Sequence, residues 1–336
     1  MSRPPRKKPA LPAPLPTTHS ILDATAVTAE VARHFDLGSG VHGELLTRGM
    51  NDVYLIEAGG QKLAARVWRA NWRSDSDVGY ELGFLEHLAD QDLPVVTSLA
   101  AEDGSRFFTV MAPEGPRQVA LFHWVPGRAV GEAPTAIACR RIGSLMGRIH
   151  KAGATYEPDE RRVIDRALQI RMDFPVLAKR MAQRPEDLNL YRLLAQSIPQ
   201  GLDAVDTNVA RFGPIHGDIH VFNAFVDADG HVSILDFDTC GEAHYLQDLA
   251  SFTWSNEYGG RDRRLTDAFL DGYETERPIP AAEAALLPLF VAAKEFRYLC
   301  GYATNVNIVG HGPLRNPDLD WFARSIRRHA REAGLL

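Results

Sequence analysis

The sequence predicts an α+β protein with two lobes, in which a small antiparallel β-sheet lobe with one inserted helix precedes a mainly helical lobe. Short extended segments separated by glycine-containing turns fill the chain up to Gly127. After Gly131, apolar residues recur at helical spacing, and only residues 214–237 interrupt this pattern with a second β-rich segment. The length of 336 residues fits two such lobes. We therefore expect lobes over residues 19–127 and 128–336.

The composition is that of a folded chain with unevenly placed charge. Lys and Arg number 37 against 43 Asp and Glu, and the net charge of −6 argues against a nucleic-acid partner. No apolar run approaches the roughly 18 residues of a membrane span, so we expect no membrane partner. The three cysteines form no C-x-x-C pair, which favours a reducing cytoplasm. Residues 1–18 combine four basic residues with repeated prolines, so we expect a mobile tail there.

The first lobe is expected to begin with a helix that Asp23 caps and that ends near Gly38, with Val27 and Val31 on its buried face. A helix is also predicted at residues 74–89, where leucines follow helical spacing. Alternation of apolar and polar residues, with glycines between the runs, predicts the strands. The expected strands are residues 41–48, 53–57, 62–68, 97–101, 106–111 and 119–125, with a hairpin turn at residues 102–105.

The second lobe is expected to open with a helix over residues 134–151, in which Ile142, Leu145, Met146 and Ile149 form a buried stripe. Helical patterns continue to residue 200 and return after the β-rich segment. A cleft between a β-rich lobe and a helical lobe is a common place for a small-ligand site. The remaining helices are predicted at residues 164–200, 244–255, 261–274, 281–302 and 318–330.

The segment over residues 215–238, IHGDIHVFNAFVDADGHVSILDFD, concentrates groups that can do chemistry. Two short apolar strands in it are joined by a turn, and their antiparallel pairing brings Asn223 near Asp236. Asp218 lies on the loop just before these strands. Two carboxylates and an amide oxygen without a thiolate suit Mg²⁺, and a carboxylate beside such a centre can accept a hydroxyl proton.

A zinc site is an alternative interpretation of the same segment. His216 and His220 are four residues apart and flank Asp218. That spacing places two imidazoles on one face only if the segment is helical. Gly217 and the strand-like run VFNAFV argue against a helix there.

The whole pattern resembles the aminoglycoside phosphotransferase-like branch of the protein kinase superfamily, which includes choline and homoserine kinase-like proteins. His216, Gly217, Asp218 and Asn223 match its H-G-D-x-x-x-x-N motif. Asp236-Phe237-Asp238 stands where D-F-G is found in protein kinases, and Asp248-Leu249-Ala250 matches a D-L-A helix. The resemblance implies a protein-kinase-like fold and phosphoryl transfer from ATP with Mg²⁺. It also implies that Asp218 is the general base, that Asn223 and Asp236 hold Mg²⁺, and that His216 braces the loop.

The same resemblance makes the first lobe the ATP clamp. It implies that the turn around Gly49 and Asn51 covers the phosphates. A strand cation should contact the phosphates, and both Lys62 and Arg66 are candidates because they share a strand face. Comparison with V-A-I-K favours Arg66, whose guanidinium binds phosphate oxygens in a fork. Glu81 is favoured over Glu86 as its acidic partner because Glu81 shares a helix face with buried leucines.

The phosphate acceptor is less clearly encoded. Asp238, Tyr245, Trp254 and Arg297 are candidates for the walls of an acceptor pocket. We expect a hydroxyl group of a small molecule, from the amino alcohol, amino acid, sugar or aminoglycoside classes. The alternatives are a protein Ser/Thr kinase of the bacterial stress-response type and a nucleotide-binding pseudokinase. The acceptor, the oligomeric state and the role of the tail stay open at this point.

Overall fold

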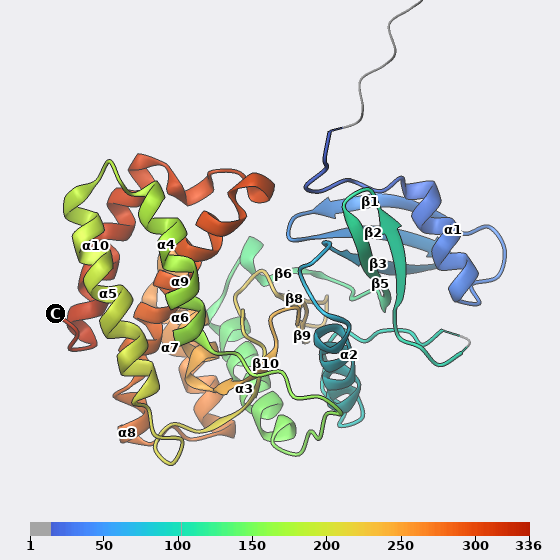
Figure 1. Ribbon diagram of the computed structural model, residues 1–336. Coiled ribbons are helices and arrows are strands. Elements are labelled where there is room, and N and C mark those ends of the chain that lie inside the picture. Colours follow the sequence, from blue (N-terminus) through green and yellow to red (C-terminus); the bar gives the residue numbers. More distant parts are fainter. Residues whose placement is uncertain (1–14, 102) are drawn as a thin grey trace, which may run out of the picture.

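The computed structural model describes residues 15–101 and 103–336, apart from the side chains of residues 316 and 317. Most of the predicted tail and Glu102 of the predicted hairpin therefore lie outside the described residues. A five-stranded antiparallel sheet forms one part of the molecule and a group of helices forms the other (Figure 1). The smaller strands β6 to β10 lie between these two parts, close to α2 and α3. This is the predicted two-lobed α+β architecture.

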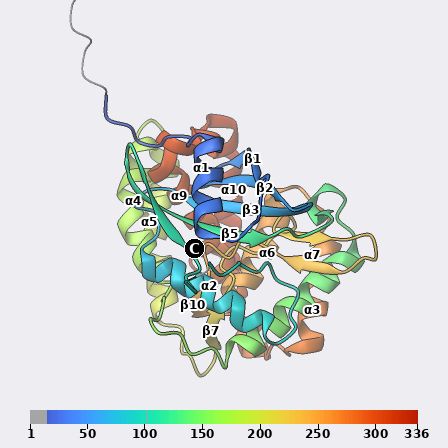
Figure 2. The ribbon, with the colours of Figure 1, turned by 90° about the vertical axis from the view of Figure 1, so that its right-hand side faces the viewer.

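The large sheet has the strand order β1-β2-β3-β5-β4. Gly59 and Gly60 adopt positive φ values and form the two-residue turn that joins β2 to β3, with Ala58 paired to Gln61. Helix α1 lies across the strands in Figure 2 and buries Val27 and Val31 against them. The bounds are α1 Ala24–His34, β1 His42–Arg48, β2 Asn51–Ala58, β3 Gln61–Trp68, β4 Phe108–Ala112 and β5 Gly115–His123.

Helix α2 (Asp75–Ala89) is inserted between β3 and β4. A capping box fixes its start, because the Ser74 hydroxyl accepts from the Asp77 backbone N–H and the Asp77 side chain accepts from Ser74 N. Leu82, Leu85 and Leu88 are fully buried on one face. The same face buries Glu81, which this helix therefore directs toward β3.

The strand predicted at residues 97–101 is wrong. Within this segment only Ser98 forms a bridge, to Phe122 of β5, whereas Val95, just before the segment, bridges to Ile234 of β9. Neither pairing is long enough to make a strand.

The helix predicted at residues 281–302 also differs, because it is split into α8 (Ala281–Ala284) and α9 (Leu287–Val309). Pro288 lies in the first turn of α9, where its missing backbone N–H is tolerated.

The second lobe places two small sheets beside its helices. One sheet has the order β6-β8-β9, and the other pairs β7 with β10. Helices α3 and α7 approach closely because Gly143 lies against the Phe269 carbonyl and Gly272 against the Arg140 carbonyl. None of the described helices is long and apolar enough to cross a membrane. The bounds are β6 Arg128–Ala129, α3 Ala136–Gly153, α4 Arg166–Arg180, α5 Pro185–Asp203, β7 Phe212–Ile215, β8 Ala224–Val226, β9 Val232–Ile234, β10 Gly241–His244, α6 Leu246–Tyr258, α7 Arg263–Glu276 and α10 Asn316–Glu332, with short 3₁₀ helices at Val130–Glu132 and Gly312–Leu314.

Candidate active site

A cleft of about 520 Å³ lies between the large sheet and the segment predicted to do chemistry. One wall comes from the β1–β2 turn and strands β2, β3 and β5, and the opposite wall comes from residues 218–239. Seven of the site residues predicted from the sequence line this single cleft. They are Gly49, Asn51, Arg66, Asp218, Asn223, Asp236 and Asp238.

Buried polar contacts hold the loop before Asp218. The Asp248 carboxylate accepts from the backbone N–H groups of His216 and Gly217 at 2.8 and 2.7 Å. His150 lies 3.0 Å from the same carboxylate, and all of these side chains are buried. The backbone of Gly217 has φ of +87°, and a Cβ there would strike the Thr239 backbone, so only glycine fits this turn.

Both ring nitrogens of His216 are occupied by protein groups. Nε2 lies 2.9 Å from the Leu235 carbonyl, and Nδ1 accepts from the Asp218 backbone N–H at 3.2 Å. The imidazole therefore links the loop before Asp218 to the segment before Asp236, which is the position that a brace requires. This arrangement leaves neither nitrogen for the zinc site considered from the sequence.

Lys294 of α9 contacts Asp218, although no motif in the sequence pointed to it. Its Nζ lies 2.5 Å from the Asp218 Oδ1. Burial alone would raise the pKa of Asp218, but Lys294 and the nearby His220 hold that pKa below its ordinary value. Asp218 is therefore an ionised carboxylate near neutral pH, partly exposed to the cleft.

Asn223 and Asp236 present oxygen atoms to the cleft. The Asn223 Nδ2 donates to the Asp218 carbonyl at 3.0 Å, which leaves its Oδ1 for another ligand. Asp236 has φ of +62°, an uncommon conformation for a residue with a side chain, and its side chain is 56% exposed. The two segments are also joined by a backbone hydrogen bond from Leu235 to Asn223. This set of oxygen ligands fits a hard divalent cation such as Mg²⁺.

Arg66 of β3, rather than Lys62, is the strand cation that reaches the cleft. Its guanidinium is buried, donates to Glu81, and lies 3.5 Å from the Asp236 Oδ1. Lys62 is exposed at the far end of β3 beside Glu57. Glu86, the other acid considered on α2, is exposed and pairs with Arg106.

Comparison with known proteins identifies the family. Residues 44–286 match the phosphotransferase enzyme family. The chain belongs to that family. A protein of Deinococcus radiodurans without a characterised function is 31% identical over 84% of this chain and 83% of its own length. The homoserine kinase of Azorhizobium caulinodans is 28% identical over 90% of this chain and 94% of its own length.

Solved structures have the same fold at low sequence identity. Amicoumacin kinase, solved in complex with AMP-PNP and Ca²⁺, superposes with a TM-score of 0.70, at 18% identity, covering 93% of this chain and 94% of that chain. A microcompartment-associated aminopropanol kinase gives 0.63 at 22% identity, covering 92% and 95%. These findings confirm the predicted family, the kinase-like fold and an enzyme that transfers a phosphoryl group to a hydroxyl group.

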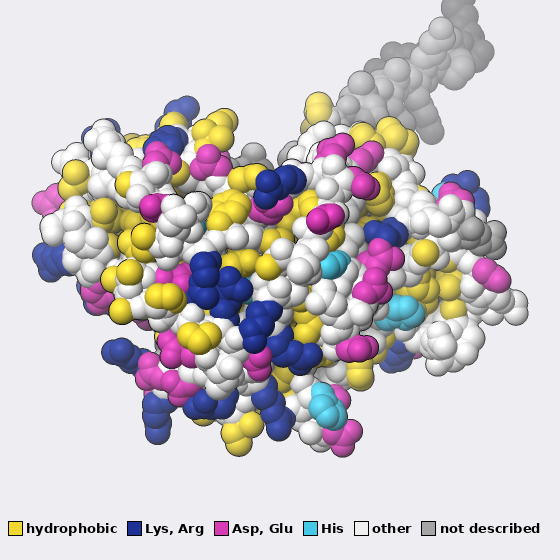
Figure 3. All heavy atoms as spheres, turned by 90° about the horizontal axis from the view of Figure 1, so that it is seen from below, with side chains coloured by type: hydrophobic (Ala, Val, Ile, Leu, Met, Phe, Trp, Pro, Cys, Tyr) yellow, Lys and Arg dark blue, Asp and Glu magenta, His cyan; other side chains and the backbone are white. Residues whose placement is uncertain are grey.

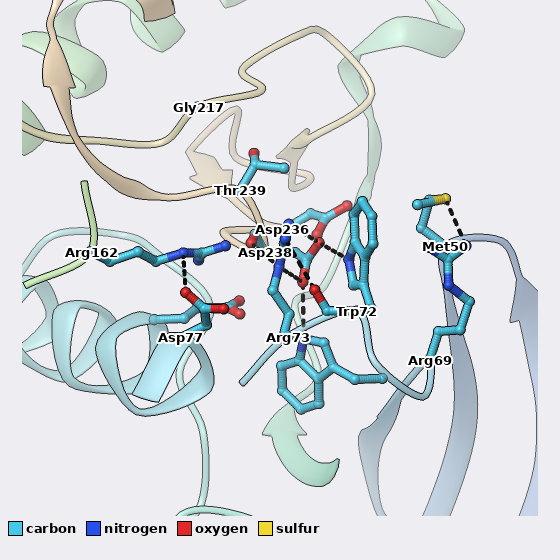
Figure 4. A network of polar contacts seen from close by, with 12 residues as sticks. Met50, Arg69, Trp72, Arg73, Asp77, Arg162, Gly217, Asp236, Asp238 and Thr239 are labelled. Carbon is cyan, nitrogen blue, oxygen red and sulfur yellow. Dashed lines mark hydrogen bonds and ion pairs between the residues drawn. The ribbon is translucent and has the colours of Figure 1, made fainter. Parts of the chain in front are cut away.

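In this phosphotransferase Asp238 is a structural junction between the lobes. Its carboxylate accepts from the indole N–H groups of Trp68 and Trp72 at 2.9 Å each, and from Arg73 at 3.0 Å (Figure 4). Burial alone would raise the pKa of Asp238, but Arg73, Arg66 and Trp72 hold it at about 2. Its oxygens are engaged by these donors and the residue is only 5% exposed, and a contact between Asp238 and the acceptor stays a prediction.

Two other predicted acceptor residues lie away from the cleft. Tyr245 is buried and stacks on His150, and Trp254 is buried in an aromatic cluster with Tyr258. Tyr245 precedes α6 and packs on α3 through His150, whereas Trp254 lies within α6 and packs against Tyr298 of α9 and Phe322 of α10. Arg297 of α9 is half-buried and lies one helical turn from Lys294, with Asp173 at 3.3 Å.

Proposed function

We propose that this enzyme transfers the γ-phosphoryl group of ATP to a hydroxyl of a small molecule, with Mg²⁺ as the metal. The observation that carries the proposal is the convergence of Asp218, Asn223, Asp236 and the Arg66–Glu81 pair on one cleft. Base, metal ligands and phosphate cation are the parts that phosphoryl transfer needs. The free, buried cysteines agree with a cytoplasmic enzyme.

Each lobe contributes a separate part of the proposed reaction. Residues 19–127 clamp the nucleotide, with Arg66 on the phosphates and the turn at Gly49 and Asn51 above them. Residues 128–336 carry the catalytic and acceptor-binding groups. Asn223 and Asp236 would hold Mg²⁺, and the bound ion would supply neutralisation of phosphate charge. Asp218 orients the acceptor hydroxyl and accepts its proton during in-line transfer.

The comparisons support a small-molecule acceptor. Several relatives across most of the chain are homoserine kinases, and structures of the same fold include an aminopropanol kinase and an amicoumacin kinase. The amicoumacin kinase was solved with an ATP analogue and a divalent cation. Such acceptors differ greatly in shape, so the family alone does not select among them.

An ATP-consumption screen over amino alcohols, amino acids, sugars, aminoglycosides and a generic protein tests the proposal. Asp218→Asn should retain nucleotide binding and lower kcat by about 10²–10⁴-fold, because the base is lost. Asp236→Ala should weaken binding of Mg·ATP. Asp229→Asn, an exposed acid on the β8–β9 turn, is the control and should behave like the wild type. Normal turnover in both active-site variants would contradict the proposal.

The same screen separates the two alternatives. Transfer to the generic protein, with no transfer to small molecules, would indicate a protein Ser/Thr kinase. Measurable ATP binding without transfer to any acceptor would indicate a pseudokinase. No observation in the cleft favours the protein kinase or the pseudokinase over the small-molecule reaction.

A further inference from the structure

Charge is distributed unevenly around the site although the whole chain is acidic. One face of the molecule gathers Lys and Arg side chains near its centre (Figure 3). Three cations also lie on the α4 and α9 side of Asp218, namely Arg166, Lys294 and Arg297. This side of the proposed base is where an acceptor would approach, because the nucleotide cleft occupies the side facing the large sheet.

Arg166 is the least compensated of the three cations. Its guanidinium donates to the side-chain oxygens of Gln247 and Gln169 at 3.0 and 2.9 Å and to the Gly217 carbonyl at 3.3 Å. All three acceptors are neutral, and no carboxylate among the described residues lies within ion-pair distance of Arg166. Burial and the neighbouring Arg297 lower the pKa of Arg166 to about 10, so an incoming anion would relieve an unfavourable charge.

Arg297 and Lys294 extend this positive region along α9. They are three residues apart and therefore lie on the same helix face. Arg297 donates to the same Gln169 oxygen as Arg166, at 3.2 Å, which brings the two guanidinium groups together. Asp173 partly compensates Arg297, and Asp218 compensates Lys294.

A narrow slot lies beside two of these cations, Arg166 and Lys294. Arg166, Lys294, Gly217 and Gln247 line it, and Gly217 is the residue directly before Asp218. Its volume of about 10 Å³ holds roughly one water molecule. A carboxylate oxygen therefore fits at its mouth better than a phosphate group, with the rest of the acceptor lying outside the slot.

We propose that the acceptor is a hydroxy compound that also carries a carboxylate, which Arg166, Arg297 and Lys294 bind while the hydroxyl lies at Asp218. This inference rests on the proposed phosphotransfer function. Guanidinium groups bind carboxylates through paired charge-assisted hydrogen bonds. A purely cationic amino alcohol would instead meet three cations here.

Matched acceptors test the proposed carboxylate. Each set contains a hydroxy amino acid, the same compound without its amine, and the same compound without its carboxylate. One set is homoserine, 4-hydroxybutyrate and 3-aminopropan-1-ol, and the other is serine, 3-hydroxypropionate and ethanolamine. The carboxylate-bearing members should have kcat/KM at least about 100-fold above the amino alcohol of the same set. Equal or faster turnover of the amino alcohols would overturn this inference alone. Absence of transfer to any hydroxy compound would overturn both this inference and the proposed function.

Variants of Arg297 separate acceptor binding from nucleotide binding. Arg297→Gln should raise KM for the carboxylate-bearing acceptor about tenfold and leave KM for ATP unchanged, whereas Arg297→Lys should recover part of the loss. Arg324→Gln removes an exposed arginine of α10 and is the control. Thermal unfolding of each variant checks that it is folded. A rise in KM for ATP, with unchanged acceptor KM, would show that the cations serve the triphosphate and would overturn the inference.

Discussion

The Trp72 indole donates a 2.9 Å hydrogen bond to the carboxylate of Asp238, which joins the loop after β3 to the loop after β9. Trp68 and Arg73 bind the same carboxylate, so one residue of the second lobe holds three of the first. Asp236, two residues earlier, faces Arg66 of β3. The position of the proposed metal ligand relative to the first lobe therefore depends on Asp238.

Replacing Asp238 by Asn should destabilise the protein by roughly 3 kcal/mol, because a buried charge pair is broken and an amide N–H is turned toward indole and guanidinium donors. Urea unfolding measures the change. Asp229→Asn, which alters an exposed acid on the β8–β9 turn, should shift stability by less than about 0.5 kcal/mol. Equal effects of the two substitutions would contradict the assigned role of Asp238.

Arg66 and Lys62 lie on the same strand and offer a matched pair for the nucleotide site. Arg66→Ala should raise KM for Mg·ATP at least about tenfold, since a charge-assisted hydrogen bond to phosphate is lost. Lys62→Ala should leave that KM unchanged because Lys62 is exposed beside Glu57. Steady-state kinetics with ATP as the varied substrate decides between them, and a larger effect at Lys62 would reverse the assignment.

The residues of the cleft that sequence could predict lie close together in the chain or share a regular element. Asn223 and Asp236 border two short paired strands, and Glu81 shares a helix face with buried leucines. Lys294 could not be found in this way, because it is 76 residues from Asp218 and no local pattern distinguishes it. The same holds for Trp72, which is 166 residues from Asp238.

Sequence patterns mislead where contacts with distant segments of the chain decide how a residue is used. Alternation of apolar residues at 97–101 is compatible with a strand, but the segment pairs with β5 only around Ser98, because Val95 just before it is bridged to Ile234 of another sheet. Tyr245 and Trp254 have side chains suited to a binding pocket, but α3 covers Tyr245, and α9 and α10 cover Trp254. Local sequence indicates that a segment can form a strand or that a side chain can line a pocket. Whether it does so depends on contacts with segments far away in the chain.

Two helical glycines, one packed between α3 and α7 and one open on α2, predict opposite effects of Gly→Ala substitutions. A Cβ at Gly143 would strike the Phe269 carbonyl, so Gly143→Ala should destabilise the protein by about 1–3 kcal/mol. A Cβ at Gly79 of α2 meets no described atom within 4 Å, and Gly79→Ala should stabilise by about 0.5–1 kcal/mol through lower chain entropy. Thermal unfolding measures both, and effects of the same sign would contradict this account.

A buried histidine holds α10 against its neighbours. His329 lies between Glu295 of α9, at 2.5 Å, and Glu257 of α6, at 3.1 Å. Burial alone would lower the pKa of His329, but the two carboxylates outweigh it and raise the pKa to about 9. The protonated imidazole is therefore the form that joins the three helices.

This raised pKa gives stability a defined pH dependence. The unfolded histidine has a pKa of about 6.5, so the contribution of His329 is fully present below that pH and is lost as pH rises through about 9. Urea unfolding should therefore show that His329→Gln costs roughly 1–3 kcal/mol more at pH 6 than at pH 10. His231→Gln, on an exposed turn, should show no such difference. A stability deficit of His329→Gln that is independent of pH would mean that the imidazole is held by packing and not by its charge.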